Sequence, residues 1–210
     1  YYADRIYQIN LAVAGIAIGT VILPNLSKYV KKNNKTKTTE IQNKALELSL
    51  FLSLPATLAL VIASEEITSS LFGYGNFDLD SVKNSSKALF FFALGLPAFS
   101  LIKIFSSFLF ARNDTNTPFI ISLLSVLLNI FISLLFFQKI GFIIIPIATT
   151  ISSWFNGFIL MILVMKKNYF NFTSNFFNKL LKILLSSFIT ILIFYYLIDF
   201  LQKYLSYESE

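Results

Sequence analysis

The sequence predicts an all-α polytopic membrane protein with about six transmembrane helices. Of its 210 residues, 56% are hydrophobic and only 13% are charged, and the mean hydropathy is +0.70. A soluble domain of this length carries more charge because its surface faces water. Residues 6–27, 115–138 and 140–165 have no charged side chain, and each run is long enough to cross about 30 Å of hydrocarbon as a helix. Three such runs in one short chain indicate a membrane protein.

Six apolar segments are predicted as the spanning helices. In chain order they cover residues 2–26, 45–72, 86–111, 118–137, 142–165 and 181–201. The first ends before a stretch with six lysines, the second before the turn Gly-Tyr-Gly-Asn-Phe, and the third at Arg112. The fourth begins at Pro118 after a turn that contains Asp114, and the fifth and sixth flank a basic aromatic stretch.

This pattern divides the chain into three parts. Residues 1–165 form a lobe of about five helices, residues 166–182 a cytoplasmic amphipathic linker, and residues 183–210 a further transmembrane helix with its tail. Two interpretations of the linker stay open: a helix lying on the inner leaflet, or a loop rich in interfacial aromatic residues. In the first, the side chains that face the acyl boundary are Tyr169, Phe170, Phe172, Phe176 and Phe177.

The orientation follows from the positive charges on the short loops. The first, third and fifth connections hold 11 of the 17 basic residues, which predicts that they are cytoplasmic. The first segment then enters the membrane from outside, and the sixth ends outside. We expect a multi-pass membrane protein.

Several classes of function are excluded by what the sequence lacks. Without cysteine or histidine there is no thiol catalysis, no disulfide and no imidazole chemistry. No phosphate-binding glycine loop and no nucleophile–base pair is present, so we expect no enzyme, no cofactor and no metal centre. The net charge of +6 lies in loops between apolar runs, which argues against nucleic-acid binding. Because the chain begins with Tyr1 inside a helical pattern, we expect a fragment without its N-terminal part, with loss of a last C-terminal helix also plausible.

The first segment opens with two charged residues, Asp4 and Arg5. At 100° per residue a single arc contains Tyr1, Arg5, Gln8, Ala12, Gly15 and Gly19. The two glycines predict close approach of another helix. Two interpretations of the charges stay open: Asp4 and Arg5 lie at the interface, or Arg5 points into a wet cavity and binds an anion, oriented by Asp4 or Gln8.

Lys103 is the second charge within a spanning segment. It precedes Arg112 by nine residues, about 13 Å of helix, which places it near the middle of the bilayer. A lysine this deep is expected to face protein or a wet cavity, where it binds an anionic headgroup or pairs with a carboxylate. Ser100 and Ser107 are predicted to share its face.

Polar side chains also line the fourth and fifth segments. They are Asn129, Ser133, Thr149, Thr150, Ser152, Ser153 and Asn156. Such groups usually bond neighbouring helices, and an ion site at Asn129 and Thr149 is the minority interpretation.

Four stretches together resemble the MurJ/MviN family of lipid II flippases, within the multidrug, oligosaccharidyl-lipid and polysaccharide exporters. They are Tyr-Tyr-Ala-Asp-Arg at 1–5, Gly-Ile-Ala-Ile-Gly-Thr-Val-Ile-Leu-Pro-Asn-Leu-Ser at 15–27, Leu-Phe-Gly-Tyr-Gly-Asn-Phe at 71–77 and Phe-Ala-Arg-Asn-Asp-Thr-Asn-Thr-Pro at 110–118. The first two are specific in order and spacing, and the other two are supportive.

The resemblance implies the second lobe of a fourteen-helix exporter-type transporter, beginning at the eighth helix. It implies that Arg5 faces a central cavity and pairs with the substrate pyrophosphate, and that Lys103 matches a basic position of some members. It further implies a sodium site near Asn129 and Thr149 in some members, but Ser133 stands where a carboxylate is expected.

The sequence thus predicts a flippase that moves lipid II, the undecaprenyl-pyrophosphate-linked peptidoglycan precursor, from the inner to the outer leaflet by alternating access. The predicted substrate-binding residues are Asp4, Arg5, Gln8 and Lys103. The expected partners are lipid II, membrane lipids and a first lobe of the same protein, with coupling to a membrane potential or an ion gradient. The alternatives are another exporter of the superfamily, for drugs or polysaccharide lipids, and a membrane scaffold that does not transport.

Overall fold

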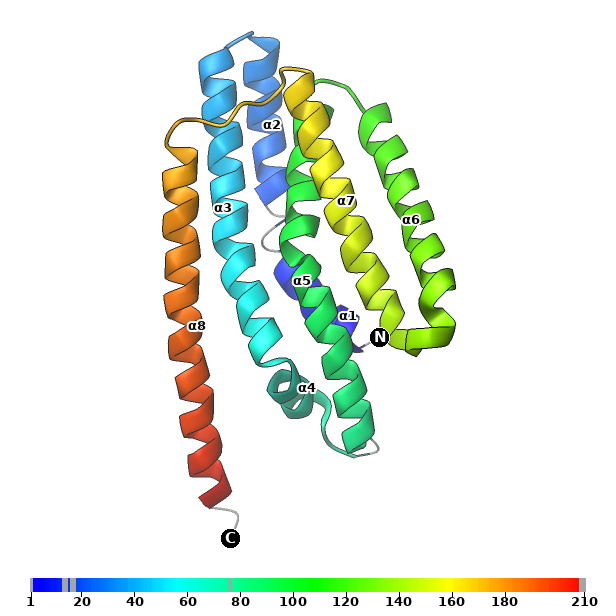
Figure 1. The fold of residues 1–210 in the computed structure, drawn as a ribbon. Coiled ribbons are helices and arrows are strands. Elements are labelled where there is room, and N and C mark those ends of the chain that lie inside the picture. The colour runs from blue at the N-terminus through cyan, green and yellow to red at the C-terminus, as the bar shows by residue number, and fades with distance from the viewer. Residues whose placement is uncertain (1, 13–14, 16–17, 76, 208–210) are drawn as a thin grey trace.

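The apolar segments form helices that run side by side in a computed structural model of the chain (Figure 1). The structure describes residues 2–12, 15, 18–75 and 77–207. Within these residues it contains helices and connections but no strand, which confirms the predicted all-α fold. The helices are α1 (Tyr2–Leu11), α2 (Ile18–Lys31), α3 (Lys35–Ile62), α4 (Ser64–Phe72), α5 (Leu79–Phe110), α6 (Asn116–Ile140), the short 3₁₀ helix η2 (Gly141–Ile143), α7 (Ile144–Lys166) and α8 (Phe176–Tyr207).

Four stretches of the described chain are, by length and composition, able to cross a membrane. They are Lys35–Ile62, Leu79–Phe110, Asn116–Lys166 and Phe176–Phe200. The third contains two helices, α6 and α7, which fold back on each other through η2 and Gly141. Gly141 has a φ of 73°, a left-handed conformation that costs glycine little because it has no Cβ.

The first predicted segment is divided, which corrects the single helix expected over 2–26. α1 ends at Leu11 and α2 begins at Ile18, and between them Ala12 and Gly15 have the wider turn of a π-helix. A wider turn shifts the phase of the helix that follows, so the predicted arc is not one continuous face. Arg5 and Ala12 are exposed, whereas Gly15 and Gly19 are buried; Tyr1 lies outside the described residues.

The lysine-rich connection over 27–44 is shorter than predicted. α2 extends to Lys31 and α3 already begins at Lys35. Asn34 caps α3, because its side-chain oxygen accepts a hydrogen bond from the backbone N–H of Lys37 at 3.0 Å. The second segment also differs from the prediction, since α3 ends at Ile62 and a separate helix, α4, follows it.

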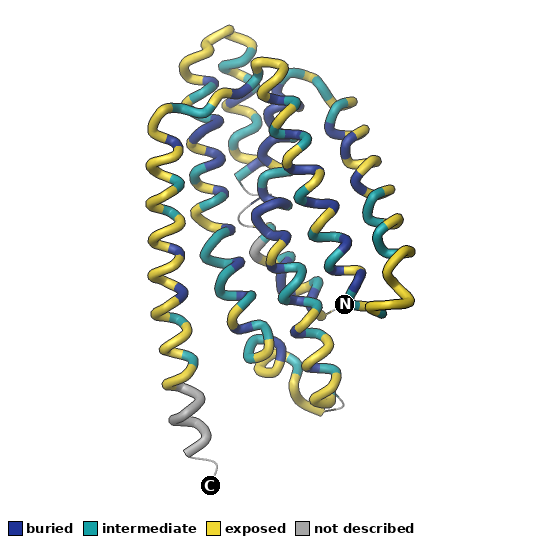
Figure 2. Tube along the Cα trace, in the orientation of Figure 1, coloured by how far each residue is buried: buried dark blue, intermediate teal, exposed yellow. Residues whose placement is uncertain are grey.

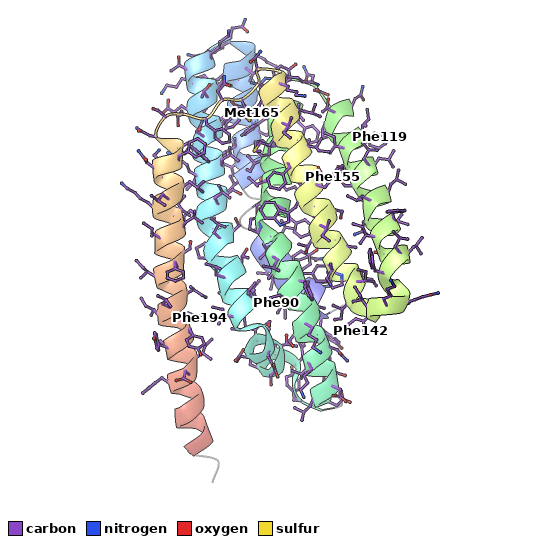
Figure 3. All side chains as sticks on the ribbon, viewed as in Figure 1. Phe90, Phe119, Phe142, Phe155, Met165 and Phe194 are labelled. Carbon is purple, nitrogen blue, oxygen red and sulfur yellow. The ribbon has the colours of Figure 1, made fainter. Side chains whose placement is uncertain are left out.

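α5 is the central helix, and α6 and α8 are peripheral (Figure 2). Leu89, Leu96, Ile104 and Phe108 of α5 are 0% exposed. The outer helices instead present large apolar side chains, such as Phe119 of α6, which is 68% exposed (Figure 3). In a membrane such faces contact lipid, so the core of this protein is the α5 axis.

The stretch expected as a linker over 166–182 consists of three pieces. Lys166 ends α7, residues 167–175 form an irregular connection, and α8 begins at Phe176. Phe170 and Phe176 do not face the acyl boundary, contrary to the interpretation of the linker as a surface helix. They are buried with Phe105 and Phe108 in the main apolar cluster. The ring of Phe170 contacts the end of α5, where its centroid lies 5.6 Å from that of Phe108.

Candidate substrate-binding site

The charged residues of α1 form a short hydrogen-bonded series on one side of the helix. The amide nitrogen Nε2 of Gln8 donates to Oδ2 of Asp4 at 2.5 Å, and Nη1 of Arg5 donates to Oε1 of Gln8 at 3.5 Å. The buried side of α1 packs against α5, where the ring of Tyr7 stacks on Phe92. Gln8 therefore links and orients the two charges, while Arg5 remains on the exposed face of α1.

The glycine pair that follows packs against α5, as the spacing predicts. A Cβ atom built on Gly15 would lie 3.4 Å from the Cα of Ser100 and 3.5 Å from Cγ of Lys103. A Cβ on Gly19 would lie 3.3 Å from Oγ of Ser107. A larger side chain at either position would push against α5, so Gly15 and Gly19 set the close approach of α5 to the start of α2 and the turn before it.

Lys103 lies in a groove of about 560 Å³ between α2, α5 and α6, which we call the Lys103 groove. Its lining residues are Gly15, Gly19, Thr20, Leu23, Ile102, Lys103, Ser106, Ser107, Phe110, Thr115, Pro118, Phe119 and Ser122. Lys103 is the only charged residue among them. Its side chain is exposed, and its ammonium group makes no hydrogen bond or ion pair with any described residue.

The predicted site residues are not gathered in one hollow. Lys103 lines its groove, but Asp4, Arg5 and Gln8 do not. Ser107 shares the groove and its hydroxyl donates to the Lys103 carbonyl at 2.8 Å. Ser100 is 0% exposed, and its Oγ has no hydrogen-bond partner among the described residues. The described chain thus presents two separate cationic positions, one on α1 and one on α5.

Asn129 and Thr149 meet across α6 and α7. Nδ2 of Asn129 donates to Oγ1 of Thr149 at 3.1 Å and lies 3.4 Å from Oγ of Ser152. A cleft of about 290 Å³ adjoins them, and it is lined by Ser125, Ser153 and Asn156 as well. These bonds join the two helices, which is the commoner role of polar groups in membrane helices. No cluster of three or more acidic residues is found in the described part of the chain.

A third group of polar contacts, which the sequence pattern did not reveal, lies where α5 and α7 end. Nη2 of Arg112 donates to the carbonyl of Tyr169 at 2.7 Å, and Nε2 of Gln42 donates to the same carbonyl at 2.9 Å. Nδ2 of Asn43 donates to the carbonyl of Asn171 at 3.0 Å, and its Oδ1 accepts from the N–H of Thr173 at 3.1 Å.

We call Gln42, Asn43 and Arg112 the clamp residues, because they hold the 167–175 connection against α3 and α5. The two amides are separated from their partners by more than 120 residues of chain. Helical periodicity carries no information about such a pairing, and the only sequence signal was an adjacent Gln-Asn pair in a lysine-rich region.

Asp114 has the turn role that the sequence predicts and also forms an ion pair. Its Oδ1 accepts from the N–H of Thr117 at 3.1 Å at the start of α6, and its Oδ2 lies 2.6 Å from Nζ of Lys167. Burial by itself would raise the pKa of Asp114, but the hydrogen bonds from Lys167 and Thr117 outweigh it and hold that pKa below its ordinary value.

Comparisons with known proteins agree on one family. The family described as "Lipid II flippase MurJ" matches residues 1–210. A "Probable lipid II flippase MurJ" from Rickettsia prowazekii (strain Madrid E) is 41% identical over 74% of the chain, and one from Rhizobium meliloti (strain 1021) is 42% identical over 76%. The chain covers 31% and 30% of these relatives, so it spans about a third of their length.

A solved structure has the same arrangement of helices. It is described as "Lipid II flippase MurJ, inward closed conformation" and has a TM-score of 0.78 at 27% identity. The similarity covers 92% of this chain and 39% of that structure's chain.

Proposed function

Because the chain belongs to the lipid II flippase MurJ family, we propose that it serves as the second lobe of a lipid II transporter in the bacterial inner membrane. The substrate is the undecaprenyl-pyrophosphate-linked peptidoglycan precursor, and its movement is from the inner to the outer leaflet. In this proposal residues 1–165 are the transport lobe, and a first lobe of the same protein supplies the rest of the cavity.

Lys103 carries the proposal. An ammonium group within an apolar spanning helix is expensive unless it faces water, protein or an anion. The ammonium group of Lys103 makes no hydrogen bond or ion pair with a described residue, and it lies in a groove beside the close contact of α2 with α5. The phosphate oxygens of a lipid headgroup would complete the hydrogen bonding of this ammonium group.

Arg5 has a complementary role in the proposal. Its planar guanidinium suits two oxygens of a pyrophosphate, and Gln8 restrains it from the next turn of α1. The headgroup would contact Arg5 and Lys103 in turn while the isoprenoid tail stays in lipid. The two lobes would rock about the binding site, which opens it to one side of the membrane and then to the other. A membrane potential or an ion gradient would reset the transporter, because moving net charge across a voltage requires energy.

The test is rescue of cells depleted of their own flippase by the complete protein that includes this chain. We expect Arg5→Gln and Lys103→Gln to abolish rescue at normal protein abundance, since each removes a phosphate partner. Lys139→Gln is the matched control, because this lysine lies in the last turn of α6 and outside the Lys103 groove.

Full rescue by both variants would reject the proposed mechanism and favour a scaffold. Drug efflux by the wild-type protein without rescue would favour another exporter of the superfamily.

A further inference from the structure

A second hollow, of about 540 Å³, lies at the end of the bundle that carries most of the lysines. We call it the end pocket. It lies where α2 turns into α3 and where the 167–175 connection passes Arg112. Its lining includes two basic residues, Lys35 and Arg112, and no acidic residue. This end is the predicted cytoplasmic one, so the end pocket lies at the level of the inner-leaflet headgroups.

Arg112 is held in place by contacts on two sides. Nη1 donates to the carbonyl of Phe108 at 2.8 Å and Nη2 to the carbonyl of Tyr169 at 2.7 Å. The guanidinium carbon also lies 4.5 Å from the centre of the Tyr169 ring. A guanidinium has five N–H donors, so three remain available after these two bonds.

The charge of Arg112 is not balanced by a carboxylate within the described residues. The three ion pairs found there join Lys37 to Glu40, Lys167 to Asp114 and Lys179 to Glu47. Arg112 is half-buried, and this burial lowers its pKa from the ordinary value because desolvation disfavours the charged form. An anion in the end pocket would attract the guanidinium of Arg112 and so offset the hydration that this group loses on burial.

The rest of the lining suits phosphate oxygens. Besides the two cations it offers the hydroxyl groups of Tyr29 and Thr39 and the side-chain amides of Asn33 and Asn171. Hydroxyl and amide N–H groups donate to phosphate oxygens, and a basic pocket between helices on the cytoplasmic side is a recurrent lipid-headgroup site.

We propose that the end pocket binds an anionic phosphate group, supplied by a phospholipid of the inner leaflet, through Arg112 and Lys35. This site is separate from the Lys103 groove, which shares none of its lining residues. Binding joins the α2–α3 turn to the 167–175 connection through the ligand. The site does not depend on the proposed transport of lipid II.

The experiment uses the complete protein in nanodiscs of phosphatidylcholine and native mass spectrometry with dioctanoyl phosphatidylglycerol as the probe. We expect saturable binding, weakened by about fivefold in Lys35→Gln and by about tenfold in Arg112→Lys, which keeps the charge but loses the planar fork. Lys31→Gln is the matched control, because Lys31 ends α2 at the same end of the bundle and does not line the end pocket.

Arg112 also holds the 167–175 connection, so Lys35→Gln is the variant that separates binding from folding. The side chain of Lys35 is exposed and makes no hydrogen bond with a described residue. Equal weakening in Lys31→Gln and Lys35→Gln would show diffuse attraction and overturn the proposal, as would the absence of saturable binding. If inorganic phosphate at the same concentration displaced the phosphatidylglycerol probe, the end pocket would bind phosphate, but its ligand would be a soluble ion and the phospholipid assignment would be wrong.

Discussion

The clamp residues and the Lys103 groove both adjoin α5, yet they differ in how completely their polar groups are bonded. In the clamp, the single side chain of Asn43 hydrogen-bonds both Asn171 and Thr173 of the 167–175 connection, and Asn43 is only 3% exposed. In the groove, the ammonium of Lys103 has no partner in the described chain. The difference fits the proposed function, in which the end of the bundle is a fixed frame and the groove is the part that takes the ligand.

The physical reason lies in the cost of an unmade hydrogen bond. A buried donor or acceptor that loses its partner costs about 1–3 kcal/mol, so the clamp resists separation of α3, α5 and α7. Small residues at a helix contact bring no such penalty when the contact shifts. Substitutions in the clamp should therefore lower stability most, and substitutions in the groove should cost less stability but lower transport as well.

The largest effect is expected in the clamp. Asn43→Leu removes a donor and an acceptor from a side chain that is only 3% exposed, and it takes away the partners of the Asn171 carbonyl and the Thr173 N–H. The free energy of unfolding should therefore fall by about 2–4 kcal/mol. Gln42→Leu should cost less, because Gln42 makes one such bond and its Oε1 already lacks a partner. Thermal unfolding of the purified protein in detergent measures both. Equal losses of stability in Asn43→Leu and Gln42→Leu would contradict the larger contribution that we assign to the Asn43 hydrogen bonds.

A moderate loss is expected at the wall of the groove. Gly19→Leu places a side chain where a Cβ already meets Ser107, so α2 must move from α5 and the unfolding free energy should fall by about 1–3 kcal/mol. The same side chain enters the Lys103 groove, so transport should fall as well. Val21→Leu is the control, since Val21 is 69% exposed. Unchanged transport in Gly19→Leu would show that the Lys103 groove is not needed for transport.

A smaller and pH-dependent effect is expected at Asp114. Because its folded pKa lies below the ordinary value, its contribution to stability is present above about pH 4 and is lost as the pH falls through the folded pKa. Asp114→Asn should therefore lower the unfolding free energy by about 1 kcal/mol at pH 7, and this difference should narrow as the pH falls below about 4. Melting temperatures of both proteins across this range measure the difference, and a constant gap would contradict the ion-pair assignment.

No measurable change is expected for Lys37→Gln. Its ion pair with Glu40 is short, at 2.8 Å, but the two side chains are 52% and 61% exposed, so water screens the attraction. This variant shows how little stability is lost when an exposed polar contact is removed, because the contact lies at the same end of the bundle as the clamp. If Lys37→Gln lost as much stability as Asn43→Leu, solvent exposure would not explain why the Lys37 ion pair contributes less than the Asn43 hydrogen bonds.

Sequence periodicity predicted the helices better than it predicted their ends. The long apolar runs require helices in hydrocarbon, because each backbone group must be bonded within its own segment. The break between α1 and α2 was missed, because the Gly15 region reads as an uninterrupted apolar run. The early start of α3 was also missed, although Asn34 is a good capping residue, since a lysine-rich stretch resembles a loop.

The candidate site was predicted in part. The spacing of Gly15 and Gly19 predicted a close helix contact, and the structure identifies α5 as the partner. The depth of Lys103 marked it as a functional candidate, and the structure places it in a groove. That Arg5 and Lys103 occupy separate positions could not be predicted, since it depends on how α1 packs against α5.

The sequence by itself determined the class of the protein: apolar runs of spanning length, positive loops at one end, and two basic residues within the membrane segments. These are local properties, because hydrophobicity and charge act on each segment separately. Only the tertiary structure decided which polar groups meet, since Asn43 and Asn171 or Lys103 and Gly19 become neighbours through packing of distant helices. Hydrogen bonds act over about 3 Å, and such proximity is a property of the assembled bundle.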